Sequence, residues 1–174
     1  MQTLISKHIT LERLLRSDIA QRHNIKEQYN PPKEIVTKLT ALAVNLLDPI
    51  EEAVKKHYPE AVMNTTSGWR CPKVNEKAGG QPGSQHMAGE AEDREFRMNG
   101  KEANVLLAQL VLKEGIVFDQ MILEYGTLNN PEWIHFSWDL DKKVQRGMIM
   151  RIGYDKADKL QVYQTTKATV LNLK

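Results

Sequence analysis

The stretch SQHMAGEAED, residues 84–93, marks the point at which a loop-like segment of the chain gives way to a predicted strand. It places His86 and Asp93 seven positions apart, with Gly89 between them. Glycine permits a tight backbone turn, and the residues that follow it, EAEDREFRM, alternate loosely as strands do. We therefore expect Asp93 near the start of a strand, pointing toward a histidine held on the preceding loop.

A second stretch, PEWIHFSW at residues 131–138, supplies another histidine, His135. Strand alternation would place Trp133 and His135 on the same face of a sheet. Two imidazoles and one carboxylate suit zinc, and hydrolytic zinc sites use three protein ligands and leave one position open for water. The sequence therefore predicts a metal site built from His86, Asp93 and His135.

Two glutamates are candidates for the general base of such a site. Glu132 lies three residues before His135, close enough for its carboxylate to accept a proton from a water molecule beside the metal. Glu124 is a rival, because it lies near the end of its own predicted strand and could point into the same site. The residues alone leave both assignments open.

A structural role is the alternative for each polar residue, because isolated histidines and acids are more often surface or hydrogen-bonded groups than ligands. The histidines outside the two stretches are assigned to that class: His8, His23 and His57. The glutamates that surround Asp93 are interpreted as solvated: Glu90, Glu92 and Glu95.

Length and composition narrow the class of protein. The 174 residues suit one domain over residues 1–174, which would bury roughly 70% of the surface that the unfolded chain exposes. A net charge of +2, from 24 basic and 22 acidic residues, is too balanced to indicate nucleic-acid binding. Cys71 is the single cysteine, which excludes an intramolecular disulfide and zinc-finger sites, and we interpret it as a packing residue.

Helical periodicity dominates the first third of the chain. Apolar spacing predicts a helix over residues 10–22, which Thr10 can cap. It predicts a longer helix over residues 34–58, which kinks or restarts at Pro49 with Asp48 as its cap.

Later segments change character. A further helix is expected in GKEANVLLAQLVLKEG, and strands are expected in EAEDREFRM, FDQMILEY, EWIHFSWDL, RGMIMRIGY and LQVYQTT. Helices first and strands later predict an α+β fold, with N-terminal helices packed on a central, mostly antiparallel β-sheet.

Several of these segments together resemble a known family. TSGWRCPKVNEKAGGQPGSQHMAGEAED, FDQMILEY and EWIHFSW are similar to the zinc peptidoglycan peptidases. That family includes D-alanyl-D-alanine carboxypeptidases, D-Ala-D-Ala dipeptidases and the L-alanyl-D-glutamate peptidases of bacteriophage endolysins. Its pattern Ser-x-His-x-x-Gly-x-Ala-x-Asp, then Trp-x-His, is filled by Ser84, His86, Gly89, Ala91, Asp93, Trp133 and His135.

The resemblance implies a fold and a set of roles. It implies an α+β domain with zinc (Zn²⁺) held by His86, Asp93 and His135 in a cleft on the sheet. It implies Glu132 as the general base, and Arg70 as the group that steadies the scissile carbonyl oxygen or a substrate carboxylate. A structural salt bridge is the alternative for Arg70. Tryptophan at position 69 departs from the tyrosine that is usual in the family.

The expected function is zinc-dependent hydrolysis of an amide bond in peptidoglycan stem peptides, of D-Ala-D-Ala carboxypeptidase or L-Ala-D-Glu endopeptidase type. The alternatives are a non-catalytic cell-wall-binding or virion structural module with the same fold, and a metal-dependent hydrolase of another amide. We expect a monomer that binds a peptidoglycan peptide, but neither nucleic acid nor a membrane. The chain shows no secretory signal and no apolar run of about 18 residues, so we expect it to stay cytoplasmic until released or exported to the cell wall.

Overall fold

A seven-stranded β-sheet lies at the centre of the structure, a computed structural model that describes residues 3–127, 129–154 and 159–173. Its strands are β1 (Val62–Ser67), β2 (Ala91–Met98), β3 (Lys101–Glu102), β4 (Gln120–Glu124), β5 (Trp133–Ser137), β6 (Met148–Tyr154) and β7 (Leu160–Gln164). The strand order is β1-β2-β5-β4-β6-β7, with β3 paired to β2. Among these strands β4 and β6 run parallel, and the other neighbouring pairs are antiparallel. The predicted sheet is therefore confirmed.

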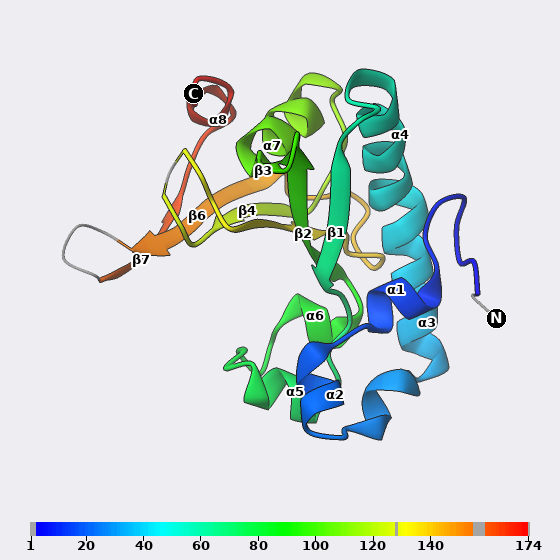
Figure 1. Cartoon of the computed structure of the whole chain (residues 1–174). Coiled ribbons are helices and arrows are strands. Elements are labelled where there is room, and N and C mark those ends of the chain that lie inside the picture. The colour runs from blue at the N-terminus through cyan, green and yellow to red at the C-terminus, as the bar shows by residue number, and fades with distance from the viewer. Residues whose placement is uncertain (1–2, 128, 155–158, 174) are drawn as a thin grey trace.

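Helices come before, between and after the strands (Figure 1). The N-terminal helices are α1 (Leu11–Leu15), α2 (Asp18–Arg22), the 3₁₀ turn η1 (Lys26–Tyr29), α3 (Lys33–Leu42), the π-helical turn η2 (Ala43–Leu47) and α4 (Asp48–His57). The later helices are α5 (Pro72–Lys77), α6 (Gln85–Ala88), α7 (Asn104–Lys113) and α8 (Lys167–Leu171). Within the described ranges, none of these helices combines the length and apolarity needed to cross a membrane.

The helix predicted over residues 10–22 is two short helices. Thr10 caps the first, as expected, since its hydroxyl accepts a hydrogen bond from the backbone N–H of Arg13 at 3.3 Å. The second begins anew because Ser17 is extended, with φ −154°, and its hydroxyl accepts from the backbone N–H of Ala20. A good N-cap residue inside an apolar pattern has divided the helix.

The predicted restart at Pro49 is present as a change of helix type, from the π-helical turn η2 to α4. The expected cap is wrong, because Asp48 is itself helical. Its carboxylate instead accepts hydrogen bonds from the backbone N–H groups of Lys7 and His8 and from the hydroxyl of Ser6. Asp48 therefore fastens the N-terminal segment to this helical turn.

The hydrophobic core lies between one face of the sheet and helices α3, α4 and α7. Phe96 on β2, Leu123 on β4 and Phe136 on β5 lie in this core, and each is at most 1% exposed. Because side chains alternate along a strand, Asp93 and His135 point to the opposite face. The core thus leaves that face of the sheet to the polar residues singled out by the sequence.

A buried polar network crosses the core side of the sheet. Arg94 and Glu92 are both fully buried, and the guanidinium of Arg94 donates to Glu92 at 2.9 and 3.0 Å. Glu51 on α4 pairs with Arg94 at 3.3 Å and with Arg13 on α1 at 2.7 Å. The hydroxyl of Thr65 on β1 donates to Glu92. The interpretation of Glu92 as solvated is wrong, because it lies on the core face and is paired there.

Candidate metal centre

Strand register brings two of the predicted ligands together. Asp93 on β2 lies directly opposite His135 on β5 in the antiparallel pair, and paired residues carry their side chains on the same face. Nδ1 of His135 lies 3.0 Å from Oδ1 of Asp93. The alternation expected for β5 therefore places His135 beside the carboxylate.

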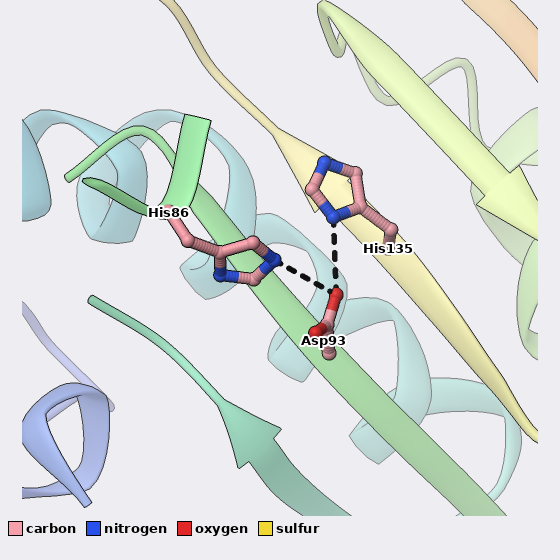
Figure 2. Close-up of side chains that lie close together, drawn as sticks. All are labelled: His86, Asp93 and His135. Atoms are coloured by element: carbon pink, nitrogen blue, oxygen red, sulfur yellow. Dashed lines mark hydrogen bonds and ion pairs between the residues drawn. The ribbon is translucent and has the colours of Figure 1, made fainter. Parts of the chain in front are cut away.

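The third predicted ligand comes from the short helix α6. This helix ends at Gly89, whose φ of +74° is the left-handed conformation that glycine adopts freely, and the chain then turns into β2. Nε2 of His86 lies 3.1 Å from the same Oδ1 of Asp93, so that both imidazoles meet at one oxygen (Figure 2). The candidate ligand atoms of His86, Asp93 and His135 lie within 4.8 Å of one another, and each residue is at most 6% exposed.

The hydrogen bond on the far side of His86 indicates what these atoms would bind. Nδ1 of His86 lies 2.7 Å from the carbonyl oxygen of Gly68, which can only accept, so Nδ1 carries the proton. In the neutral imidazole, Nε2 then turns a lone pair toward the carboxylate of Asp93. Two electron-rich atoms at 3.1 Å require a positive charge, either a proton on Nε2 or a metal ion beside both atoms. The donor set suits zinc.

The backbone at Gly68 and Trp69 packs against Leu14 in helix α1. A Cβ atom on Gly68 would lie 2.2 Å from the carbonyl oxygen of Leu14, and that oxygen accepts a hydrogen bond from the backbone N–H of Trp69 at 2.8 Å. Only glycine fits so close to another backbone. The carbonyl that orients His86 is thus positioned by the first helix of the chain.

Arg70 lies against the other oxygen of Asp93. Its Nη2 donates to Oδ2 at 2.7 Å, and its Nε donates to the hydroxyl of Ser67 at 2.8 Å. This ion pair is the structural role that the sequence left as the alternative, and the side chain remains 18% exposed. Burial opposes the charge on Asp93, but the charges and hydrogen bonds of His86 and His135 outweigh it and hold the pKa of this carboxyl well below its usual range.

The two candidate bases occupy different environments. Glu124 pairs with Trp133 across β4 and β5, and therefore shares the face that carries His135. The indole N–H of Trp133 donates to Oε2 of Glu124 at 3.1 Å. Glu132 precedes the first residue of β5, and it is exposed.

Electrostatics also connect Glu124 with the site. Burial raises the pKa of Glu124 and the charge of Asp93 raises it further, against smaller opposing effects of His135, Trp133 and Arg70. A carboxylate with a raised pKa is a stronger base. Of the two candidate bases, Glu124 is the one that lies on the face carrying His135; the sequence had offered it as the rival of Glu132.

The chain turns sharply after Glu124. Tyr125 has a φ of +54°, which is costly for a residue with a side chain, typically about 1–3 kcal/mol. The guanidinium of Arg151, which is 3% exposed, donates to the carbonyl oxygens of Leu123, Tyr125 and Gly126. Sequence reasoning missed Arg151, because nothing in the pattern of β6 distinguishes a buried arginine from a solvated one.

A second acidic group lies elsewhere, formed by Glu90, Asp139 and Asp141. The ammonium group of Lys38 already lies within this group, at 2.8 Å from Glu90 and 3.0 Å from Asp141. Hydrogen bonds from these two carboxylates raise the pKa of Lys38. The group is therefore an ion-pair cluster around a lysine, and the interpretation of Glu90 as solvated is wrong, since it is 8% exposed.

The buried group of His86, Asp93 and His135, on one face of the sheet, is a candidate metal site. The family model for Peptidase M15 matches residues 7–137, and the chain belongs to this family. The family consists of peptidases, most of which are zinc-dependent. The resemblance drawn from the sequence is thus confirmed. A search among curated proteins found no match.

Proposed function

We propose that this protein is a zinc-dependent peptidase that hydrolyses an amide bond in peptidoglycan stem peptides, of D-Ala-D-Ala carboxypeptidase or L-Ala-D-Glu endopeptidase type. One observation carries the proposal, namely the convergence of His86, Asp93 and His135 in a chain of the peptidase M15 family. These three side chains would hold the ion, which when bound polarises the scissile carbonyl and acidifies a water molecule.

The protein's own groups would divide the remaining work. Glu124 would take a proton from the attacking water and deliver it to the departing amine, because it lies on the sheet face that carries His135. Glu132 is the second candidate for this role. Arg70 holds one oxygen of Asp93 and would present its remaining N–H groups to the negative charge that develops on the substrate.

The test is digestion of purified muropeptides by the full-length protein, with mass analysis of the products. Loss of one terminal D-alanine would identify a carboxypeptidase, and separation of L-Ala from D-Glu an endopeptidase. Activity should disappear with a chelator and return with zinc. His135→Ala should be inactive, whereas His57→Ala, which changes an exposed histidine paired with Glu114, should retain activity.

A zinc-loaded protein that binds but does not cleave any muropeptide would contradict the proposal. That result would favour the alternative, a non-catalytic cell-wall-binding or virion structural module. Full activity after complete removal of metal would contradict the assignment of His86, Asp93 and His135.

A further inference from the structure

The outer nitrogen of His135 faces the side-chain amide of Gln85, the residue next to the ligand His86. Nε2 of Gln85 donates a hydrogen bond to Oδ2 of Asp119 at 3.1 Å. A carboxylate oxygen can only accept here, so this contact decides which end of the amide is which. The other end, Oε1, lies 3.5 Å from Nε2 of His135, at the long limit of a hydrogen bond.

Asp119 is built into the fold as a fixed acceptor. It is fully buried directly before β4, and its backbone forms hydrogen bonds of 2.8 and 3.0 Å with the backbone of Ser137 and Met148. Its carboxylate receives the guanidinium of Arg146, with Nε at 2.9 Å, and the ammonium of Lys142 at 3.3 Å. Asp119 is therefore held in place from several directions.

The charge on Asp119 is also fixed. Burial opposes it, but hydrogen bonds from Arg146 and Lys142 outweigh burial and hold the pKa of this carboxyl below its usual range. A carboxylate that stays ionised keeps accepting from Gln85, and the amide of Gln85 cannot turn over without pointing its oxygen at a negative charge. The amide oxygen of Gln85 is thereby kept toward His135.

We propose that Gln85 and Asp119 are positioning residues: the amide oxygen of Gln85, oriented by Asp119, would accept the Nε2–H of His135 when its Nδ1 binds a metal. The amide oxygen of Gln85 would support His135 as the carbonyl oxygen of Gly68 supports His86, across 3.5 Å rather than 2.7 Å. Hydrogen-bond acceptors behind metal-binding histidines orient the ring, and their loss typically lowers metal affinity by about 10–100-fold.

The contacts behind His135 extend to the segment between β5 and β6. Lys142 and Arg146 both belong to the segment between β5 and β6, and both end on Asp119. The segment, Asp119, Gln85 and His135 therefore form one continuous set of contacts that ends at the metal position. Neither Gln85 nor Asp119 needs to touch substrate to influence the site.

The test compares Gln85→Met, which keeps the volume of the side chain but removes the acceptor, with the wild type in the full-length protein. In the metal-free protein Nδ1 of His135 faces the carboxylate of Asp93 at 3.0 Å, so the readout is taken with zinc bound. Proton NMR should show slow exchange of the His135 Nε2–H with solvent in the zinc-loaded wild type, and faster exchange in zinc-loaded Gln85→Met. Zinc affinity, measured by competition with a chromophoric chelator, should fall by about 10–100-fold. Gln81→Met, which changes an exposed glutamine four residues earlier, should leave both readouts unchanged.

Equal solvent exchange of the His135 Nε2–H in the two zinc-loaded proteins would overturn the inference. Unchanged zinc affinity in a folded Gln85→Met protein would do the same. The inference rests on the proposed metal site, but both readouts are taken without substrate. A failure of the peptidase proposal would therefore remain distinguishable from a failure of this one.

Discussion

The indole of Trp133 donates a hydrogen bond to the carboxylate of Glu124, from one strand of the sheet to the next, at 3.1 Å. Because the two residues are paired across β4 and β5, this bond keeps the acid on the face that carries His135. Glu132 lies only one residue before Trp133, yet it precedes the strand and is exposed. Proximity in sequence to His135 therefore favours Glu132 as the base, whereas position on the sheet face favours Glu124.

We expect Glu124→Gln to lower kcat by about 10²–10⁴-fold, because a positioned general base typically contributes that much. Zinc affinity should change little, since the residue does not belong to the ligand group. Glu132→Gln is the matched control and should stay within about tenfold of wild type on the same scale. Steady-state kinetics on a purified muropeptide would check both, and the reverse order of effects would return the role to Glu132.

Arg70 should act first on Asp93, the proposed metal ligand with which it forms an ion pair. Arg70→Met removes the hydrogen bond to Oδ2 of Asp93, so we expect zinc affinity to fall by about 10–100-fold together with activity. Arg97→Met is a suitable control, because that arginine is 42% exposed in its side chain and lies farther along β2. Normal zinc affinity combined with a large loss of kcat would assign Arg70 to the substrate alone.

Much of the site could be predicted because it depends on local periodicity. Alternation along β5 placed His135 with Trp133, and Gly89 marked the turn into β2. Strand pairing supplied what periodicity cannot, since only the register of β4 against β5 distinguishes Glu124 from Glu132. The contact of Gln85 with Asp119 joins residues 34 positions apart, and no pattern within either stretch announces it.

The burial of charged residues was harder to predict from the sequence than the burial of apolar ones. Glu92 stands among residues that look solvated, yet its place on the core face beside Arg94 makes it a buried ion pair. Cys71, by contrast, was interpreted as a packing residue and is 2% exposed. An apolar residue is expected to be buried because of its own side chain. A charged residue is buried only where another residue pairs with it, and the sequence pattern does not show that pairing.

Removal of one member of the buried ion pair should destabilise the fold strongly. Glu92→Ala leaves the charge of Arg94 buried with a weaker partner, and such losses typically cost about 3–5 kcal/mol. Urea denaturation would measure the change in the free energy of unfolding. Glu95→Ala on the same strand is the control and should cost less than about 1 kcal/mol. Equal effects of the two substitutions would refute this account of the network.

The stability that Asp119 contributes should depend on pH in one direction. Its pKa is lower in the folded protein than the usual 3.8, so its contribution is complete above about pH 4 and is lost as the pH falls toward the folded value. The difference in unfolding free energy between wild type and Asp119→Asn should thus be largest near neutral pH and shrink in acid. Urea titrations from neutral to acidic pH would measure it, with Asp141→Asn, a 74% exposed aspartate, as the control. A gap that widens in acid would contradict the sign.

Gly68→Ala should disturb both the fold and the metal centre. The added Cβ would overlap the backbone of Leu14, and crowding of this kind typically costs about 1–3 kcal/mol. Displacement of the Gly68 carbonyl should also loosen His86 and weaken zinc binding. Thermal unfolding and chelator competition would follow the two effects, with Gly83→Ala as the control, since a Cβ there meets nothing within 4 Å. A variant with wild-type melting temperature and wild-type zinc affinity would rule out this close approach.

The contact between Leu14 and Gly68 connects helix α1 with the candidate metal site, because the Gly68 carbonyl orients His86. A protein shortened by its first fifteen residues would still encode every predicted ligand, yet the support behind one imidazole would be missing. Zinc affinity would then report whether α1 packs against Gly68. For a protein with a fusion partner at the N-terminus, zinc affinity should therefore be compared with that of the unfused protein.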